Sequence, residues 1–114
     1  MRAEMAPFGV HVTALCPGSF RTDWAGRSMM RTERSIADYD ALFDPIRQAR
    51  QAKSGKQLGD PDKLAAAVLG LVESDNPPPQ LLLGSDALGL VSDKVERLKH
   101  KIEAWKSVTV STDG

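Results

Sequence analysis

The apolar positions change period early in the chain, which predicts a short helix followed by a strand. Residues 2–6 are good helix formers, and Pro7 ends the run. The segment 10–16 is β-branched at three positions and lies between Gly9 and Pro17, so its length and boundaries predict a strand. Apolar side chains fall on both faces of this strand, as is typical of a parallel sheet covered by helices on each side. A helix, a turn and an apolar strand in this order indicate an α/β fold.

The second half of the chain alternates in the same way. Asp60-Pro61 is a typical helix start, and the apolar residues that follow it recur at helical spacing. This predicted face consists of Leu64, Val68, Leu71 and Val72. Residues 81–83 predict a short buried strand, and residues 91–105 predict a final helix with a narrow apolar stripe. The stripe consists of Val91, Val95, Leu98, Ile102 and Trp105, and the polar segment 107–114 after it is expected to be a loose tail.

Between these halves, residues 23–56 are expected to form a long loop with helical pieces. Asp44-Pro45 resembles a capping residue followed by proline at the first helical position, which predicts a helix from there to Gly55. Asp40 and Asp44 stand four residues apart, but the arginines around them favour a solvated helix face over a catalytic pair of carboxylates.

The loop after the first predicted strand is the main candidate for binding chemistry. Open α/β sheets place ligands at the carboxyl ends of their strands, and this loop begins there. Gly18 allows the backbone to approach a ligand, and the Thr22 hydroxyl can both donate and accept a hydrogen bond. His11 and His100 have no partners at metal-ligand spacing, so no metal site is predicted. Pocket lining and ordinary packing both remain open for Trp24, Met29, Met30 and Tyr39.

Composition excludes several classes of protein. The chain has 114 residues, one cysteine, and 15 basic against 15 acidic residues, so its formal net charge is zero. That length suits one domain, and a neutral chain offers no basic surface for nucleic acid or an anionic membrane. One cysteine excludes an intrachain disulfide framework, and no apolar run approaches the roughly 20 residues that cross a bilayer. The N-terminus lacks the apolar core of a signal peptide, so we expect a cytoplasmic protein.

Three blocks of sequence, taken in their order, resemble one enzyme family. The first is Arg2-Ala-Glu-Met-Ala-Pro-Phe-Gly-Val-His-Val-Thr-Ala-Leu-Cys-Pro-Gly-Ser-Phe-Arg-Thr22, which contains the pattern Pro-Gly-x-x-x-Thr after an apolar strand. The others are Gly59-Asp-Pro-Asp-Lys-Leu-Ala-Ala-Ala-Val68 and Pro78-Pro-Gln-Leu-Leu-Leu-Gly-Ser-Asp-Ala87. The first block resembles the sixth helix and sixth strand of a short-chain dehydrogenase/reductase, and the other two resemble its late helix and last strand.

The resemblance implies an incomplete fold. Residues 1–106 are similar to the C-terminal part of one Rossmann-like, doubly wound parallel sheet, with about two parallel strands, flanking helices and a substrate lid over 23–56. In this family the loop with the Pro-Gly pattern borders the nicotinamide end of NAD or NADP. The residues that match its cofactor contacts are Pro17, Gly18, Phe20 (through its backbone) and Thr22.

Two motifs of the family are absent from this sequence. It contains no Gly-x-x-x-Gly-x-Gly turn and no Tyr-x-x-x-Lys, since the only tyrosine, Tyr39, is followed four residues later by Phe43. No catalytic residue is therefore assigned. The family's activity is hydride transfer between NAD(P) and a carbonyl or alcohol, and we expect the chain alone to be inactive and to bind dinucleotide weakly or not at all.

The sequence leaves two functions open. The leading interpretation is part of an NAD(P)-dependent oxidoreductase that acts on a small molecule, and the alternative is a non-catalytic module that docks through the helix at 91–105. A strand at 10–16 with one neighbour has an unpaired edge, so self-association, or pairing with a complementary N-terminal half, is expected. Neither the substrate nor the choice between NAD and NADP follows from these residues.

Overall fold

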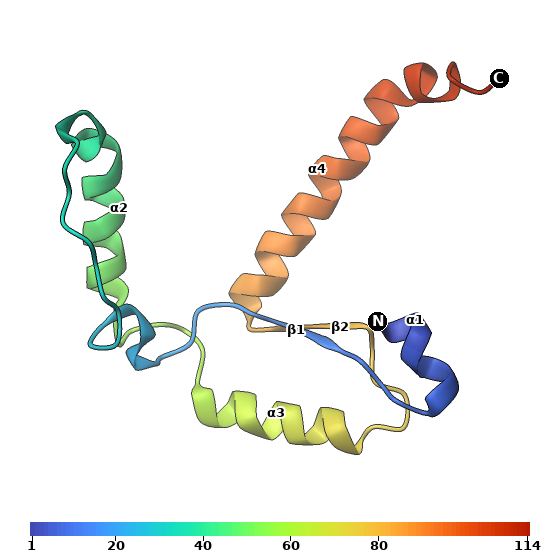
Figure 1. Cartoon of the computed structure of the whole chain (residues 1–114), viewed down its shortest axis with the longest axis horizontal. Coiled ribbons are helices and arrows are strands. Elements are labelled where there is room, and N and C mark those ends of the chain that lie inside the picture. Colours follow the sequence, from blue (N-terminus) through green and yellow to red (C-terminus); the bar gives the residue numbers. More distant parts are fainter.

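Helices extend in different directions from a small parallel sheet in the computed structural model, which describes all residues 1–114 (Figure 1). In chain order the elements are α1 (Arg2–Met5), η1 (Ala6–Phe8), β1 (Ala14–Pro17), η2 (Asp23–Ala25), η3 (Ala37–Tyr39), α2 (Asp40–Lys53), α3 (Pro61–Glu73), β2 (Gln80–Leu83) and α4 (Ser85–Val110). The order and the parallel pairing of β1 with β2 confirm the α/β class and the incomplete two-stranded sheet.

The first strand is shorter than the sequence predicts. It begins at Ala14 instead of residue 10, and it pairs from Ala14 opposite Gln80 to Pro17 opposite Leu83. The segment before β2 explains the difference. Residues 77–79 are all prolines, which have no N–H to continue the ladder of hydrogen bonds with β1. Their carbonyls are used instead, and the Thr13 hydroxyl donates to that of Pro78 at 2.7 Å.

The helix predicted at Asp60-Pro61 is present. Asp60 caps α3, and its side chain accepts a hydrogen bond from the Asp62 N–H at 3.0 Å. The predicted apolar face is only partly correct: its first three members are half-buried, but Val72 is 77% exposed near the end of the helix.

The middle helix begins earlier than predicted. Helix α2 starts at Asp40, so Pro45 lies inside it, although the sequence pattern placed Pro45 at its first turn. Arg34 accounts for the earlier start, since its guanidinium forms ion pairs with both Asp40 and Asp44 along the first turn. An acidic residue is favourable there, next to the unpaired N–H groups at the helix start. The helix ends before Gly55, which has a positive φ of 77°.

The C-terminal helix is longer than predicted. Helix α4 begins at Ser85, directly after Gly84 with its positive φ of 103°, and continues through Val110. Residues 107–110, expected to belong to a loose tail, are therefore helical. In Figure 1 α4 leads away from the sheet as a long arm, and α2 stands apart from it.

The fold buries very little of its surface. Only Pro77, Leu83 and Ala87 are buried, and the radius of gyration is 20.1 Å, against about 13 Å for a compact domain of this size. One edge of β1 is unpaired, and Leu15 on this strand is 41% exposed. None of the helices contains an apolar stretch of the length that crossing a membrane requires.

Candidate functional site

The loop that follows β1, residues 18–22 (hereafter the Gly18 loop), is held by backbone bonds to two distant segments. The Gly18 N–H donates to the carbonyl of Leu83 at 2.8 Å, which extends the β1–β2 ladder by one bond. The Gly59 N–H donates to the Ser19 carbonyl at 2.9 Å, and the Arg21 N–H donates to the Gly59 carbonyl at 3.0 Å. These bonds hold Phe20 and Gly59 side by side as a parallel bridge. The loop is thus fixed although it belongs to no long strand.

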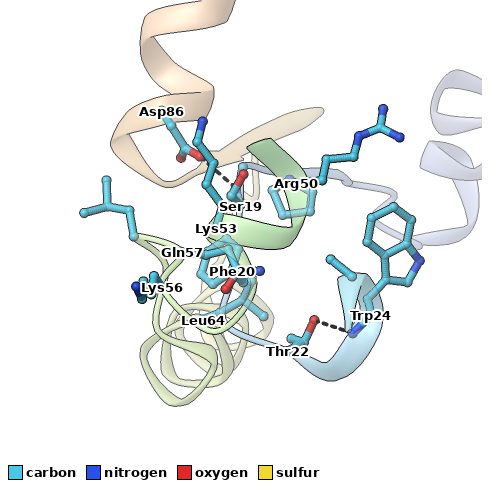
Figure 2. A pocket seen from close by; sticks show the side chains of 14 residues that line it. Ser19, Phe20, Thr22, Trp24, Arg50, Lys53, Lys56, Gln57, Leu64 and Asp86 are labelled. Atoms are coloured by element: carbon cyan, nitrogen blue, oxygen red, sulfur yellow. Dashed lines mark hydrogen bonds between the residues drawn. The ribbon is translucent and has the colours of Figure 1, made fainter. Parts of the chain in front are cut away.

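Asp86, in the first turn of α4, closes the other side of this loop. Its Oδ2 accepts from the Ser19 N–H at 2.7 Å (Figure 2). Its Oδ1 accepts from the Ala87 N–H at 3.0 Å. The hydrogen bond from Ser19 is the main reason that the pKa of Asp86 lies below the ordinary aspartate value, with burial acting in the opposite sense. Asp86 is therefore an anion at neutral pH and a weak general base.

Two glycines make these close approaches possible. A Cβ at Gly18 would lie 2.0 Å from Oδ1 of Asp86, and a Cβ at Gly59 would lie 2.5 Å from the ring of Phe20. Neither distance is compatible with a side chain. A larger residue at Gly18 has to displace the Asp86 carboxylate, and one at Gly59 has to displace Phe20 and the Ser19 carbonyl. Arg21 adds a further link, since its Nη1 donates to the Gln57 carbonyl at 3.0 Å.

A cleft of about 760 Å³ opens beside the loop, and all four residues that match the family's cofactor contacts line it (Figure 2). These are Pro17, Gly18, Phe20 and Thr22. Thr22 also caps η2, because its hydroxyl oxygen accepts from the Trp24 N–H at 3.4 Å, and its own O–H remains free to donate. The Phe20 N–H donates to no other group of the chain.

The rest of the cleft wall comes from segments far from the loop in sequence. The end of α2 and the turn after it contribute three cations, Arg50, Lys53 and Lys56. Apolar lining comes from Trp24, Leu58 and Leu64, and Figure 2 shows Trp24 and Arg50 on one side of the view and Lys56 on the other.

The other residues for which the sequence leaves pocket lining open do not all lie at this cleft. Tyr39 lines a separate hollow of about 420 Å³, where its ring lies 6.2 Å from that of Phe43. Met29 and Met30 line neither hollow, and Met30 is 98% exposed. Trp24 lines the larger cleft.

Asp40 and Asp44 both bind Arg34, which agrees with a helix face rather than a carboxylate pair. Its hydrogen bond to Asp40 raises the pKa of the Arg34 guanidinium, so Arg34 stays charged. No group of three or more His, Cys, Asp or Glu side chains is close enough together to hold a metal ion.

Sequence reasoning missed Ser19, Asp86 and the three cations as parts of one site. The sequence does carry a signal for Asp86, which follows β2 after a Gly-Ser turn and so lies at the same sheet end as the Gly18 loop. The cations were visible only as basic composition, because no pattern showed that α2 would bring them to this cleft.

Comparison with known proteins relates both the sequence and the fold to oxidoreductases. The oxidoreductase BOA17 of Botryotinia fuckeliana is 34% identical over 109 residues, which cover 96% of this chain and 39% of that protein. An uncharacterized oxidoreductase of Schizosaccharomyces pombe is 27% identical over 111 residues, covering 96% of this chain and 36% of that protein. No protein-family model matches the chain.

A solved structure supports the same relation. The crystal structure of a short-chain dehydrogenase from Streptomyces avermitilis superposes with a TM-score of 0.77 at 32% identity, covering 98% of this chain and 40% of that protein. The chain thus spans about two fifths of the length of the relatives that it matches. Its open shape agrees with this, because an element of a larger domain leaves uncovered the surfaces that the rest of that domain would contact.

Proposed function

We propose that this chain, which has the sequence and fold of part of a short-chain dehydrogenase/reductase, supplies the nicotinamide-side wall and the substrate lid of an NAD(P)-dependent oxidoreductase. The reaction is hydride transfer between the cofactor and a carbonyl or alcohol. One observation carries the proposal: Pro17, Gly18, Phe20 and Thr22 line a single cleft whose position is fixed by bonds from three parts of the chain.

The polar groups of the Gly18 loop fit the nicotinamide end of the cofactor. The Phe20 N–H and the Thr22 O–H are free donors, and such donors suit the amide group carried by the nicotinamide ring. Gln57 lines the same cleft, and its buried Oε1 has no hydrogen-bond partner in the chain, so it can accept from an amide N–H.

The chain's own residues would orient the reaction and would not move its protons. Bound NAD(P) supplies the hydride. The Gly18 loop would hold the nicotinamide ring at the carboxyl end of β1, and Trp24 would exclude water from one side of the cleft. The only carboxyl group in the lining is Asp86, and because its pKa is lowered it is a poor proton donor at neutral pH.

The chain alone is expected to be inactive. Its sequence contains neither Tyr-x-x-x-Lys nor the Gly-rich turn with which this fold cradles the pyrophosphate at a helix start. Both contributions have to come from residues other than these 114.

A chimera tests this function. Residues 1–114 replace the matching 40% of the Streptomyces avermitilis short-chain dehydrogenase, and NAD(P)H turnover is followed with a panel of aldehydes and ketones. The chimera should turn over NAD(P)H, and Thr22→Val should lower kcat/KM about fivefold through loss of one hydrogen bond. Thr109→Val is the matched control, because that hydroxyl bonds within α4 to the Trp105 carbonyl. A folded chimera without turnover would contradict the proposal.

Docking through α4 is a second candidate function. The stripe residues along α4 are between 41% and 66% exposed, and they are Val91, Val95, Leu98, Ile102 and Trp105. The occupant proposed for this stripe is the remaining three fifths of a dehydrogenase domain, since the matched protein has that much chain outside the superposed part. Co-purification of the chain with the separately expressed remainder of the dehydrogenase domain tests this docking. Leu98→Glu should release that partner, and retention of the partner by the variant would contradict docking through α4.

A further inference from the structure

Three cations of the cleft have no acidic partner. Arg50, Lys53 and Lys56 line the same cavity as the Gly18 loop, and none of them forms an ion pair within the chain. Other cations, such as Arg47 on α2, also lack an acidic partner. What distinguishes these three is that they line one cleft together with the Gly18 loop.

The one acid in the lining does not neutralise these cations. Both carboxylate oxygens of Asp86 accept backbone N–H bonds, from Ser19 and from Ala87. Three positive charges against one negative charge leave the lining with a net charge of +2, in a chain whose total formal charge is zero. Such a cleft attracts an anion and repels a cation.

Apolar side chains line the cleft together with the cations. Trp24 is 71% exposed and Leu58 is 68% exposed, and both line the cleft together with Leu64. Exposed apolar surface next to unpaired cations suits a ligand with an apolar body and one anionic end.

We infer that the oxidoreductase substrate is an amphipathic anion: its apolar body packs on Trp24 and Leu58, and its carboxylate or phosphate is attracted by the positive charge that Arg50, Lys53 and Lys56 give the cleft. The substrate role rests on the proposed function, whereas anion binding in the cleft does not. An arginine with two lysines can hold either kind of oxyanion through charge-assisted hydrogen bonds. The pyrophosphate of the cofactor is the competing source of negative charge, and the test separates the two.

The chain provides its own reporter for the test. It has two tryptophans, Trp24 in the cleft and Trp105 on α4, so the indole N–H region of a ¹⁵N spectrum contains one signal for the site and one for a distant control. The full 114-residue chain is titrated, without NAD(P), with 2-naphthoate, with 2-naphthyl phosphate, with uncharged 2-naphthamide, and with inorganic pyrophosphate. The expected result is a saturable shift of Trp24, but not of Trp105, with either naphthyl anion and a much weaker one with the amide.

Charge-neutralising variants locate the anion. Arg50→Gln and Lys53→Gln should each weaken 2-naphthoate binding about fivefold, and raising the salt concentration should weaken it further. Lys101→Gln is the matched control, because Lys101 is an exposed cation of α4 that does not line the cleft, and it should change the affinity less than about twofold. Arg50 and Lys53 are both exposed, so the two substitutions are expected to leave the fold intact. Unchanged signals of Trp105 and of the backbone amides verify this.

Three outcomes overturn the inference. They are no shift of Trp24 with either anion, an equal shift with 2-naphthamide, and a response to pyrophosphate alone, which would assign the cations to the cofactor. Failure of the proposed function looks different: the chimera would lack NAD(P)H turnover while the cleft still bound 2-naphthoate.

Discussion

The Gly18 loop is bonded to parts of the chain that are distant in sequence, whereas the long arm of α4, residues 89–110, bonds only to itself. The loop donates to the Leu83 carbonyl and the Asp86 carboxylate and exchanges backbone bonds with Gly59, and its hydrogen-bond partners lie up to 67 residues away in sequence. The α4 arm has side-chain bonds only within its own helix, and its apolar stripe is exposed.

This difference shows which properties the chain holds by itself. Polar contacts alone fix the shape of the cleft wall, because they need only the two short strands and the turns at their ends. Burial of apolar surface, which normally supplies most of the stability of a domain, is nearly absent here. A formed site on an uncovered fold is what one part of a larger domain should show.

The largest effect is expected from filling the space at Gly18. Gly18→Val places side-chain atoms where the Asp86 carboxylate lies, so that carboxylate has to move away and the Ser19–Asp86 hydrogen bond that anchors the loop has to break. In the chimera, turnover of NAD(P)H should fall about a hundredfold, because small displacements of positioning groups have effects of that order.

A glycine in the α4 arm is the matched control. A Cβ at Gly89 has nothing within 4 Å, so Gly89→Ala should leave turnover unchanged and should stabilise the helix by about 0.5–1 kcal/mol. Equal turnover of the Gly18→Val and Gly89→Ala chimeras would show that the loop does not shape the site.

The second largest effect is expected on self-association through the α4 arm. Without other polypeptide to cover it, the α4 stripe should make the isolated chain self-associate, and Leu98→Glu should weaken that association at least about tenfold. Sedimentation velocity over a range of concentrations measures it, with Lys101→Glu as the control for added negative charge. A sharp, concentration-independent melting transition of a monomer would contradict this expectation.

A smaller effect is expected at the junction of the loop with α3. Asp60 caps α3 and lies 3.7 Å from Arg21, so Asp60→Ala should destabilise the start of this helix by about 1 kcal/mol. Asp60→Asn keeps a capping side chain, so it should destabilise the start of α3 much less than Asp60→Ala. Amide hydrogen exchange at the first turn of α3 measures both, and equal exchange in the two variants would rule out a capping role.

The smallest effect is a dependence on pH near Asp86. Because its pKa is lower in the folded loop than in an unfolded chain, the stabilisation is complete above about pH 4 and is lost as the pH falls through the lowered pKa. Exchange of the Ser19 amide should therefore show an acid-dependent loss of protection that Asp86→Asn lacks. The same pH profile in the Asn variant would mean that another group titrates.

Local signals predicted the elements whose causes lie within a few residues. The helix start at Asp60-Pro61 and the apolar strand 81–83 were both visible, because capping and apolar runs act over short distances. The loop after β1 could be named as a binding candidate for the same reason: the turn Pro17-Gly18 directly follows an apolar strand.

The errors have causes that lie far away in sequence. The strand at 10–16 shortened because its partner segment consists of prolines, and α2 began before Pro45 because Arg34 pairs with Asp40. The hydrogen bond of Asp86 to the Gly18 loop and the position of the three cations at the cleft depend on the tertiary fold. The spacing of apolar residues along the sequence does not predict such tertiary contacts.

Calorimetric titration of NADH and NADPH tests most directly whether this chain carries one wall of a cofactor site and depends on other polypeptide for the rest. The isolated chain and the chimera are titrated under the same conditions, with the oligomeric state of each sample determined in parallel. We predict no saturable binding to the isolated chain and saturable binding to the chimera. Saturable binding of either nucleotide to a monomer of the isolated chain would contradict this account.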